Sequence, residues 1–133
     1  MARRRRQSAR GAAAVEFALI LPLMMLLVLG AVEWGYYFWV SQVVTNAARE
    51  GARAGTLHET DNAAAYADAT ATAQAYLTGA HLKVANAGLK VDLNTLPGGV
   101  QSVRVHVEYK TGLTGFALLA VPKQALADAE MRR

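Results

Sequence analysis

Gly11–Val40, with the sequence GAAAVEFALILPLMMLLVLGAVEWGYYFWV, is the stretch that decides the fold of this chain of 133 residues. It holds a carboxylate at Glu16, runs uncharged from Phe17 to Val32, and continues after Glu33 into a cluster of aromatic side chains. At the rise of an α-helix, Phe17 to Val40 would extend roughly 36 Å, whereas the hydrocarbon core of a bilayer is about 30 Å thick. The sequence therefore predicts a transmembrane helix over residues 12–40, with the lipid bilayer as a partner.

The charges before this stretch predict its orientation. Residues 1–10 contain five arginines and no acidic residue. Because an excess of basic residues beside a first span stays in the cytoplasm, we expect a cytoplasmic N-terminus and an extracytoplasmic C-terminal domain at the plasma (inner) membrane. Amphipathic rings gather where a span meets the headgroups, and four residues are predicted to form such an outer interfacial belt: Trp34, Tyr36, Tyr37 and Trp39.

A carboxylate at the start of an apolar run is costly in lipid, so Glu16 indicates a function. It lies five residues after Gly11, which ends the basic segment, and Phe17 follows it. This arrangement resembles the cleavage site of type IV pilin-like precursors. The resemblance implies that a prepilin peptidase cuts between Gly11 and Ala12, which makes residues 1–11 a cleaved basic leader. It also implies recognition through Glu16 and Phe17, with Glu16 pairing to the N-terminal amine of a neighbouring subunit to set the register of a filament.

A longer run, from Arg10 to Gly55, is similar to the TadE-like minor pilins (pseudopilins) of tight-adherence, type IVc pilus systems. The matching features are RGAAAVEF at 10–17, Leu-Pro at 21–22, GxxExG at 30–35 and NAAREGAR at 46–53. The resemblance implies a structural or assembly role in pilus biogenesis and surface attachment. It implies as partners the other pilin and pseudopilin subunits and the inner-membrane assembly platform, and a place in the membrane or in an extracellular pilus.

Other interpretations of the N-terminal stretch remain open. An ordinary uncleaved signal anchor would show the same arginines and the same span. A secretory signal peptide fits less well, because apolar and aromatic residues continue past a weak cleavage candidate before Ala31. A twin-arginine signal lacks the hydrophobic residues that should follow Arg5 and Arg6 directly. The corresponding alternative function is an uncleaved, membrane-anchored binding module, either an adhesin or an envelope sensor.

Composition excludes several other classes of function. The net charge of +4 and the pI near 9.7 suggest nucleic acid, but five of the 14 basic side chains lie in residues 1–11, which leaves nine against ten acidic ones. No nucleic-acid partner is therefore expected. Without cysteine, the outer domain must be held together by packing alone. The three histidines lack a sequence spacing typical of a triad or a metal site, so we expect no enzyme activity, cofactor or metal: His58, His81 and His106.

The first helix is expected to begin at Ala12 and to continue to about Gly55. Pro22 removes one N–H inside it and predicts a kink or local melting. Beyond the membrane, residues 41–57 should form an amphipathic continuation in which Ala47, Gly51 and Gly55 recur every four residues on one side. Small residues at this spacing permit close helix approach. Packing on the protein's own strands is the favoured interpretation, and packing on another subunit is the alternative.

The remaining residues, 58–133, predict a small extracytoplasmic head. Asp61 is a good N-cap for a second helix over 62–78, with Gly79 at the C′ position. Its expected apolar stripe consists of Tyr66, Ala69, Ala73 and Tyr76/Leu77.

Residues 89–94 and 103–110 then alternate between apolar and polar side chains, which is typical of two strands of a hairpin with a turn at 96–99. An apolar loop is expected at 112–121. The tail 124–133 has helical propensity but alternates at Ala127, Ala129 and Met131, and the family resemblance favours a third strand. The expected fold class is α+β: a single-pass membrane protein in which one long N-terminal helix packs on an antiparallel sheet of two to three strands with a second, short helix.

Overall fold

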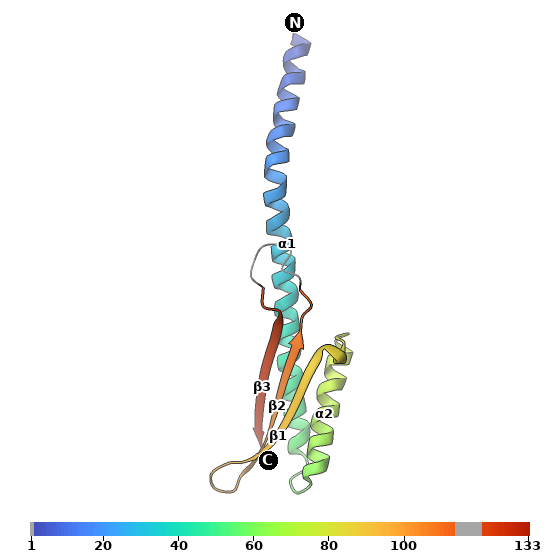
Figure 1. Ribbon diagram of the computed structural model, residues 1–133, viewed down its shortest axis with the longest axis vertical. Helices are drawn as coiled ribbons and strands as arrows, with labels where there is room; N and C mark the ends of the chain where they lie inside the picture. The colour runs from blue at the N-terminus through green and yellow to red at the C-terminus, as the bar shows by residue number, and fades with distance from the viewer. Residues whose placement is uncertain (1, 114–120) are drawn as a thin grey trace.

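The computed structural model describes the backbone of residues 2–113 and 121–133 and the side chains of residues 11–113 and 121–133. It confirms the α+β fold: a long helix α1 (Ala2–Thr56), a second helix α2 (Asn62–Gly79), a short 3₁₀ turn η1 (Val84–Asn86) and a three-stranded antiparallel sheet (Figure 1). Most of the apolar segment 112–121, expected to form a loop, lies outside the described residues.

α1 begins at Ala2, so the prediction that the first helix begins at Ala12 is wrong. Arginine, glutamine and alanine are good helix formers, and no glycine or proline interrupts them before Gly11. The helix also continues without a break through Pro22, so local melting is not observed there. Leucine on both sides of Pro22 and the two methionines after it favour the helix strongly enough to keep it continuous.

α2 has a defined cap at each end. Asp61 Oδ1 accepts hydrogen bonds from the N–H groups of Ala63 and Ala64 at 2.9 and 3.0 Å, as its N-cap position predicts. At the other end, His81 donates to Thr78 O and Leu82 to Leu77 O, which is a Schellman motif. The residue at C′ is therefore His81, with φ of 59°, and the prediction of Gly79 is wrong.

The position of this helix end follows from packing. Leu77 and Leu82 are both buried, and the apolar contact that accompanies a Schellman motif joins residues at these two positions. A glycine at C′ would adopt the left-handed backbone conformation more easily. The burial of Leu77 and Leu82 outweighs this advantage, and histidine is among the residue types that tolerate a positive φ.

The sheet has the order β1-β2-β3, with β1 (Ala87–Thr95), β2 (Gln101–Lys110) and β3 (Gln124–Arg132). β3 confirms the prediction of a strand in the tail. Val105 pairs with Val91 of β1 and Ala129 of β3, so the alternating apolar residues of all three strands share one face. Gly98 and Gly99 have φ of 93° and 81° in the β1–β2 turn, a conformation that favours glycine.

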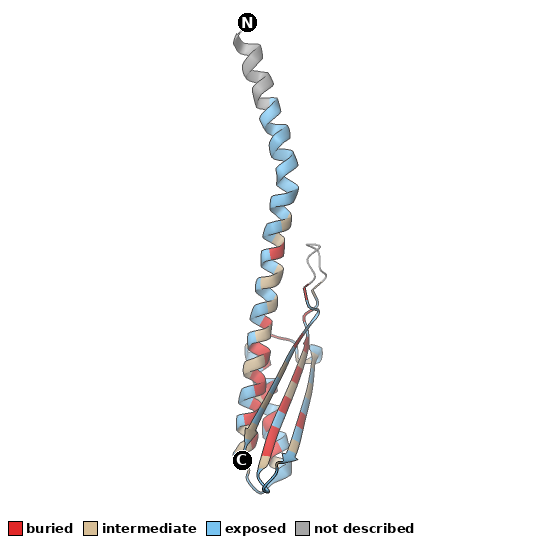
Figure 2. Ribbon diagram, turned by 90° about the vertical axis from the view of Figure 1, so that its left-hand side faces the viewer, coloured by how far each residue is buried: buried red, intermediate tan, exposed pale blue. Residues whose placement is uncertain are grey.

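Both helices cover the apolar face of the sheet: α1 lies against α2, β2 and β3, and α2 lies also against β1 (Figures 1 and 2). The core consists of β-branched residues from the sheet and small residues from the helices. In α2 the buried stripe differs from the expected one, because Tyr66 is 50% exposed and Ala65 takes its place. The buried stripe of α2 is Ala65, Ala69, Ala73 and Leu77.

Candidate functional site

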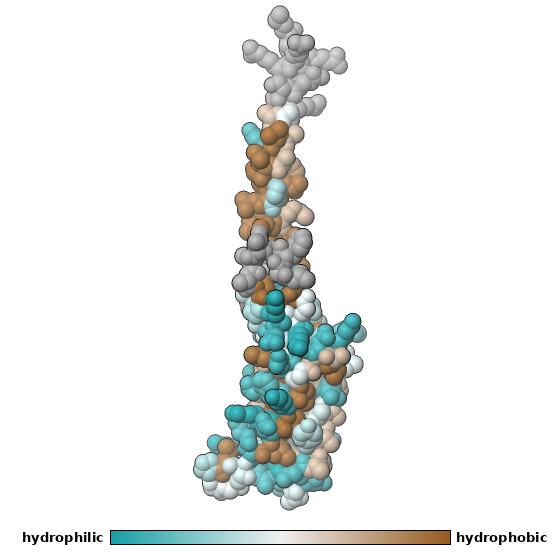
Figure 3. Space-filling model, in the orientation of Figure 1, coloured by the Kyte–Doolittle hydropathy of each residue, from teal (hydrophilic) through white to brown (hydrophobic). Residues whose placement is uncertain are grey.

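Residues 11–32 of α1, called here the apolar half, are mainly apolar and stand clear of the head (Figure 1). Most of its large apolar side chains from Val15 to Val32 are exposed, and their positions run round the whole helix. Figure 3 shows one face of this part as the brown surface above the head. A helix that is hydrophobic all round belongs either in a protein core or in a membrane, and no core surrounds this one. Within the described residues, it is the one helix long and apolar enough to cross a bilayer. These features fit membrane anchoring.

Gly11, Ala12, Glu16 and Phe17 lie at the start of this apolar half, within the continuous helix and away from the head. All four are exposed, and a Cβ atom placed on Gly11 would meet nothing within 4 Å. Among the ion pairs of the described residues, none includes Glu16. The backbone around Gly11 is therefore open to a second protein, and the Glu16 carboxylate can accept a partner from another chain.

The aromatic residues 34–39 surround α1 just before it enters the head. Trp34 contacts Tyr37 and Phe38, with ring centroids 5.9 and 5.6 Å apart, and Tyr36 contacts Trp39 at 5.8 Å. Tyr37 also packs against the core of the head, whereas Trp39 is 46% exposed. The cluster thus has one side on the head and another facing outward, and the core begins immediately after it at Val40, which is fully buried.

The small residues Ala47, Gly51 and Gly55 lie inside the head rather than on an open face. A Cβ atom on Gly51 would lie 2.8 Å from the carbonyl oxygen of Ala69 in α2, and one on Gly55 would lie 2.8 Å from Val103 Cγ1 in β2. Such distances leave no room for a side chain. The spacing of four therefore serves the contact of α1 with α2 and β2 of the same chain.

Two histidine–carboxylate pairs were not predicted from sequence spacing. His58 Nε2 lies 2.6 Å from Asp68 Oδ2, and His106 Nδ1 lies 2.9 Å from Asp128 Oδ1. The second pair bridges β2 and β3, so its partners are far apart in sequence but adjacent in the sheet register. The sequence alternation of the two strands predicts their faces but not their register, and only the register would have brought His106 and Asp128 together. Both pairs lie at the surface of the head.

Arg133 makes a third set of contacts that sequence reasoning missed. Its Nη1 donates to His58 O at 2.6 Å, and its Nη2 donates to the side-chain oxygens of Asn62 and Gln101. One guanidinium group therefore joins the α1–α2 connection, the start of α2 and the start of β2. No group of three or more histidine, aspartate or glutamate side chains that could hold a metal ion occurs in the described part of the chain.

Comparison with known proteins agrees with the geometry of α1. Residues 11–53 match the family described as TadE-like protein. The match covers the exposed apolar half, the aromatic cluster and most of the small-residue face, and residues 54–133 lie outside it. The searches of curated proteins and of solved structures found no match. Over residues 11–53, about a third of its length, the chain is therefore similar to TadE-like proteins, and this match supports an association with the Tad pilus system.

Proposed function

We propose that this protein is a minor pilin, or pseudopilin, of a tight-adherence pilus, matured by a prepilin peptidase that cuts after Gly11. Its role is structural rather than catalytic: it supports pilus biogenesis and, through the pilus, surface attachment. The observation that supports this most directly is the combination of an exposed apolar half of α1 with an open Gly11 and an exposed Glu16 at its start. The family match begins at the same glycine.

The topology follows from the charges and the exposed apolar surface. The arginines of residues 1–10 stay in the cytoplasm, residues 12–40 cross the membrane, and residues 41–57 carry the helix into an extracytoplasmic head formed by residues 58–133. The partners in the membrane are the prepilin peptidase, the assembly platform and the other pilin and pseudopilin subunits.

The position of Gly11 within a continuous helix gives the cleavage step a physical requirement. A protease binds an extended backbone, so α1 must unwind locally before it can be cut. Glycine is about 1 kcal/mol less favourable than alanine in a helix, which lowers the cost of unwinding at this point. Its missing side chain also lets the peptidase approach the backbone closely.

The test is the intact mass of the protein extracted from the membranes of its own host. A chain that begins at Ala12 supports peptidase processing. We expect a Gly11→Val variant to remain unprocessed, because valine both stiffens the backbone and fills the open surface. Gly35→Val is the matched control, since Gly35 lies in the same helix and is equally open, and it should be processed normally.

Normal maturation of Gly11→Val would exclude this processing site. A wild-type chain that keeps residues 1–10 in its native membrane would favour the alternative function, an uncleaved anchored binding module. Co-purification with sheared pili then separates a subunit of the filament from an assembly factor that stays in the membrane.

A further inference from the structure

The membrane-facing end of the head is formed where several elements begin or end together. Lys110 at the end of β2 pairs with Gln124 at the start of β3, and Tyr109 pairs with Ala87 at the start of β1. η1 directly precedes β1, and the C-terminal end of α2 lies at the same level (Figure 1). Figure 1 shows that this end of the head is turned toward the exposed apolar half of α1.

All four lysines of the chain lie at or near this end. Lys83 caps η1, Lys110 ends β2, and Lys123 precedes β3; these three residues are named here the lysine rim. Lys90 stands a few residues further along β1, and all four side chains are exposed. The ion pairs of the described residues use histidine and arginine but no lysine.

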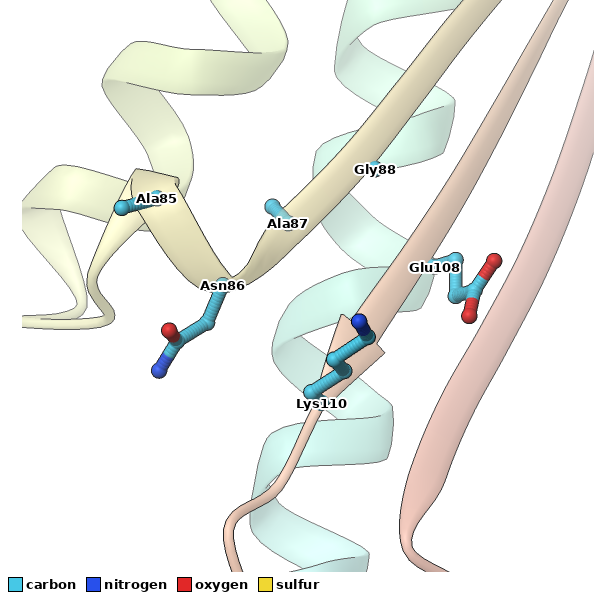
Figure 4. Close-up of a pocket in the computed structure, with 6 residues that line it drawn as sticks. All are labelled: Ala85, Asn86, Ala87, Gly88, Glu108 and Lys110. Atoms are coloured by element: carbon cyan, nitrogen blue, oxygen red, sulfur yellow. The ribbon is translucent and has the colours of Figure 1, made fainter.

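Few negative charges accompany the lysine rim. A cavity of about 270 Å³ beside it is lined by Asn86, Lys110 and, further along β2, Glu108 (Figure 4). The connection from Lys110 to Lys123 contains no charged residue in its sequence. The carboxylates of the α1–α2 connection and of the first turns of α2 lie at the opposite end of the head: Glu59, Asp61 and Asp68.

The lysine rim lies close to the aromatic cluster of α1. Val43 lines a cavity together with Gly79 and Ala80, so the C-terminal end of α2 is level with Val43. Val43 follows Trp39 by four residues, which is about 6 Å along a helix axis. With Trp39 at the membrane interface, the level of Val43 and of the end of α2 lies within one Debye length, about 8 Å at physiological salt, of the headgroups. Lysine side chains at this end of the head are long enough to extend toward that interface.

We infer that the lysine rim docks on anionic phospholipid headgroups of the bilayer that holds α1. Basic residues this close to an anionic leaflet each contribute about 1 kcal/mol of attraction. Lipid is the partner that the aromatic cluster and the exposed apolar half of α1 place next to the rim, whereas a soluble anion would not need either feature. The contact holds the head upright against the membrane before assembly. It rests on the proposed membrane anchoring of α1, but not on processing or on a pilin role.

Because the chain has no cysteine, the inference can be tested with single-cysteine probes on the full-length protein. Ala85→Cys places a fluorophore beside the lysine rim, and Thr60→Cys places one at the far end of the head; both positions are exposed. The protein is reconstituted in vesicles of phosphatidylcholine alone or mixed with phosphatidylglycerol, each with a headgroup quencher. We expect quenching of the Ala85→Cys probe to rise with phosphatidylglycerol and to fall again in high salt, while the Thr60→Cys probe does not change.

The variant Lys83→Gln/Lys110→Gln/Lys123→Gln should lose this dependence on anionic lipid, because the equilibrium constant for docking should fall about fivefold for each lysine replaced. The matched control Arg49→Gln/Arg53→Gln/Arg132→Gln removes the same charge from exposed positions outside the rim and should keep it. Equal quenching in both kinds of vesicle, or an equal loss in the arginine variant, would overturn the inference. Failure of α1 to insert is recognised separately, because the protein would then float with neither kind of vesicle.

Discussion

Glu16 is the one carboxylate between Gly11 and Val32, and in the isolated subunit its side chain is exposed on the apolar half of α1. Scales of membrane insertion give a carboxylate at the centre of a span a cost of roughly 2.5–3.5 kcal/mol, and at the start of the span, where Glu16 lies, the cost is smaller. Pairing with an amine of a neighbouring subunit would remove that cost only in the assembly. We therefore expect Glu16→Ala to be cleaved as the wild type is but to yield few pili, as measured by intact mass and by the amount of sheared filament.

Glu16→Gln separates charge from shape in this prediction, because glutamine keeps the size of the side chain. Both variants should fail to assemble if the charge gives the register. Wild-type piliation in Glu16→Ala would remove the register role while leaving the cleavage site untouched.

Asp61 gives a second prediction at the scale of one residue. The hydrogen bond from the Ala64 N–H, followed by that from Ala63, holds the pKa of this carboxyl below its ordinary value of 3.8. A carboxyl whose pKa is lower in the folded state stabilises the fold above its unfolded pKa, and this contribution is lost as the pH falls through the folded pKa. Asparagine caps a helix about as well but does not titrate.

We therefore expect Asp61→Asn to unfold at nearly the wild-type temperature near neutral pH and to lose less stability than the wild type as the pH falls below 3.8. Circular dichroism melts of both proteins in the same detergent across this range provide the measurement, and the other carboxylates cancel in the comparison. Parallel pH profiles for the two proteins would contradict the role of Asp61 as a charged cap.

At the scale of elements, the contact between α1 and α2 depends on two glycines of α1. Gly51→Ala would place a Cβ atom 2.8 Å from the carbonyl oxygen of Ala69, which is backbone and can yield only if the helices move apart. We expect a loss of about 1–3 kcal/mol in the free energy of unfolding, because overpacking a tight interface outweighs the better helix propensity of alanine.

Gly79→Ala is the matched control, since Gly79 is also helical but a Cβ atom there meets nothing within 4 Å. It should stabilise the head by about 0.5–1 kcal/mol through backbone entropy. The two variants, measured by thermal unfolding in detergent, must therefore shift in opposite directions. A shift of the same sign for both would show that propensity rather than close approach governs Gly51.

The elements themselves could be predicted wherever one physical signal dominated. The apolar stretch 17–32 is long enough to define its helix, and alternation at Val103, Val105 and Val107 identifies β2 because one face of the sheet is buried. The stripe of α2 was partly wrong because residue type favoured Tyr66, whereas the available depth is set by Gly51 and Gly55 of the facing helix. Close approach of this kind is a property of two elements and cannot be seen in one.

The candidate site divides in the same way. Gly11 and Glu16 could be proposed from the sequence because their motif is local, and their roles stay predictions. The pair of His106 and Asp128 could not, because it arises from the register of β2 on β3, two strands that are separated by residues 111–123 in the sequence. The same holds for Arg133, whose contacts lie in three separate segments of the chain.

At the scale of the whole molecule, the chain has two parts, the exposed apolar half of α1 and the head, and α1 runs without a break from one into the other. Up to Val32, α1 exposes most of its large apolar side chains, whereas from Val40 onward its buried residues belong to the core of the head. A tilt or rotation of the apolar half is therefore transmitted to the head through the aromatic cluster at 34–39. When the apolar halves of several subunits pack together, their packing therefore also fixes the orientation of the heads.

The end of the head far from the membrane is held by Arg133, and this gives the last prediction. Its guanidinium group is bonded to the carbonyl of His58 and to the side chains of Asn62 and Gln101, and its backbone N–H donates to Gln101 O at 2.9 Å. Hydrogen bonds that involve a charged group each contribute about 1.5–3 kcal/mol when buried, and partial exposure reduces this here. We expect Arg133→Gln to destabilise the head by about 1–2 kcal/mol and to speed hydrogen exchange in residues 57–64.

Arg132→Gln is the matched control, because Arg132 is exposed on the outer face of β3 and should change neither quantity. If both variants melt together with the wild type and exchange at the same rate, the connection between α1 and α2 is held without Arg133, by contacts such as the Asp61 cap and the His58–Asp68 pair, and the tip of the head is independent of the end of β3.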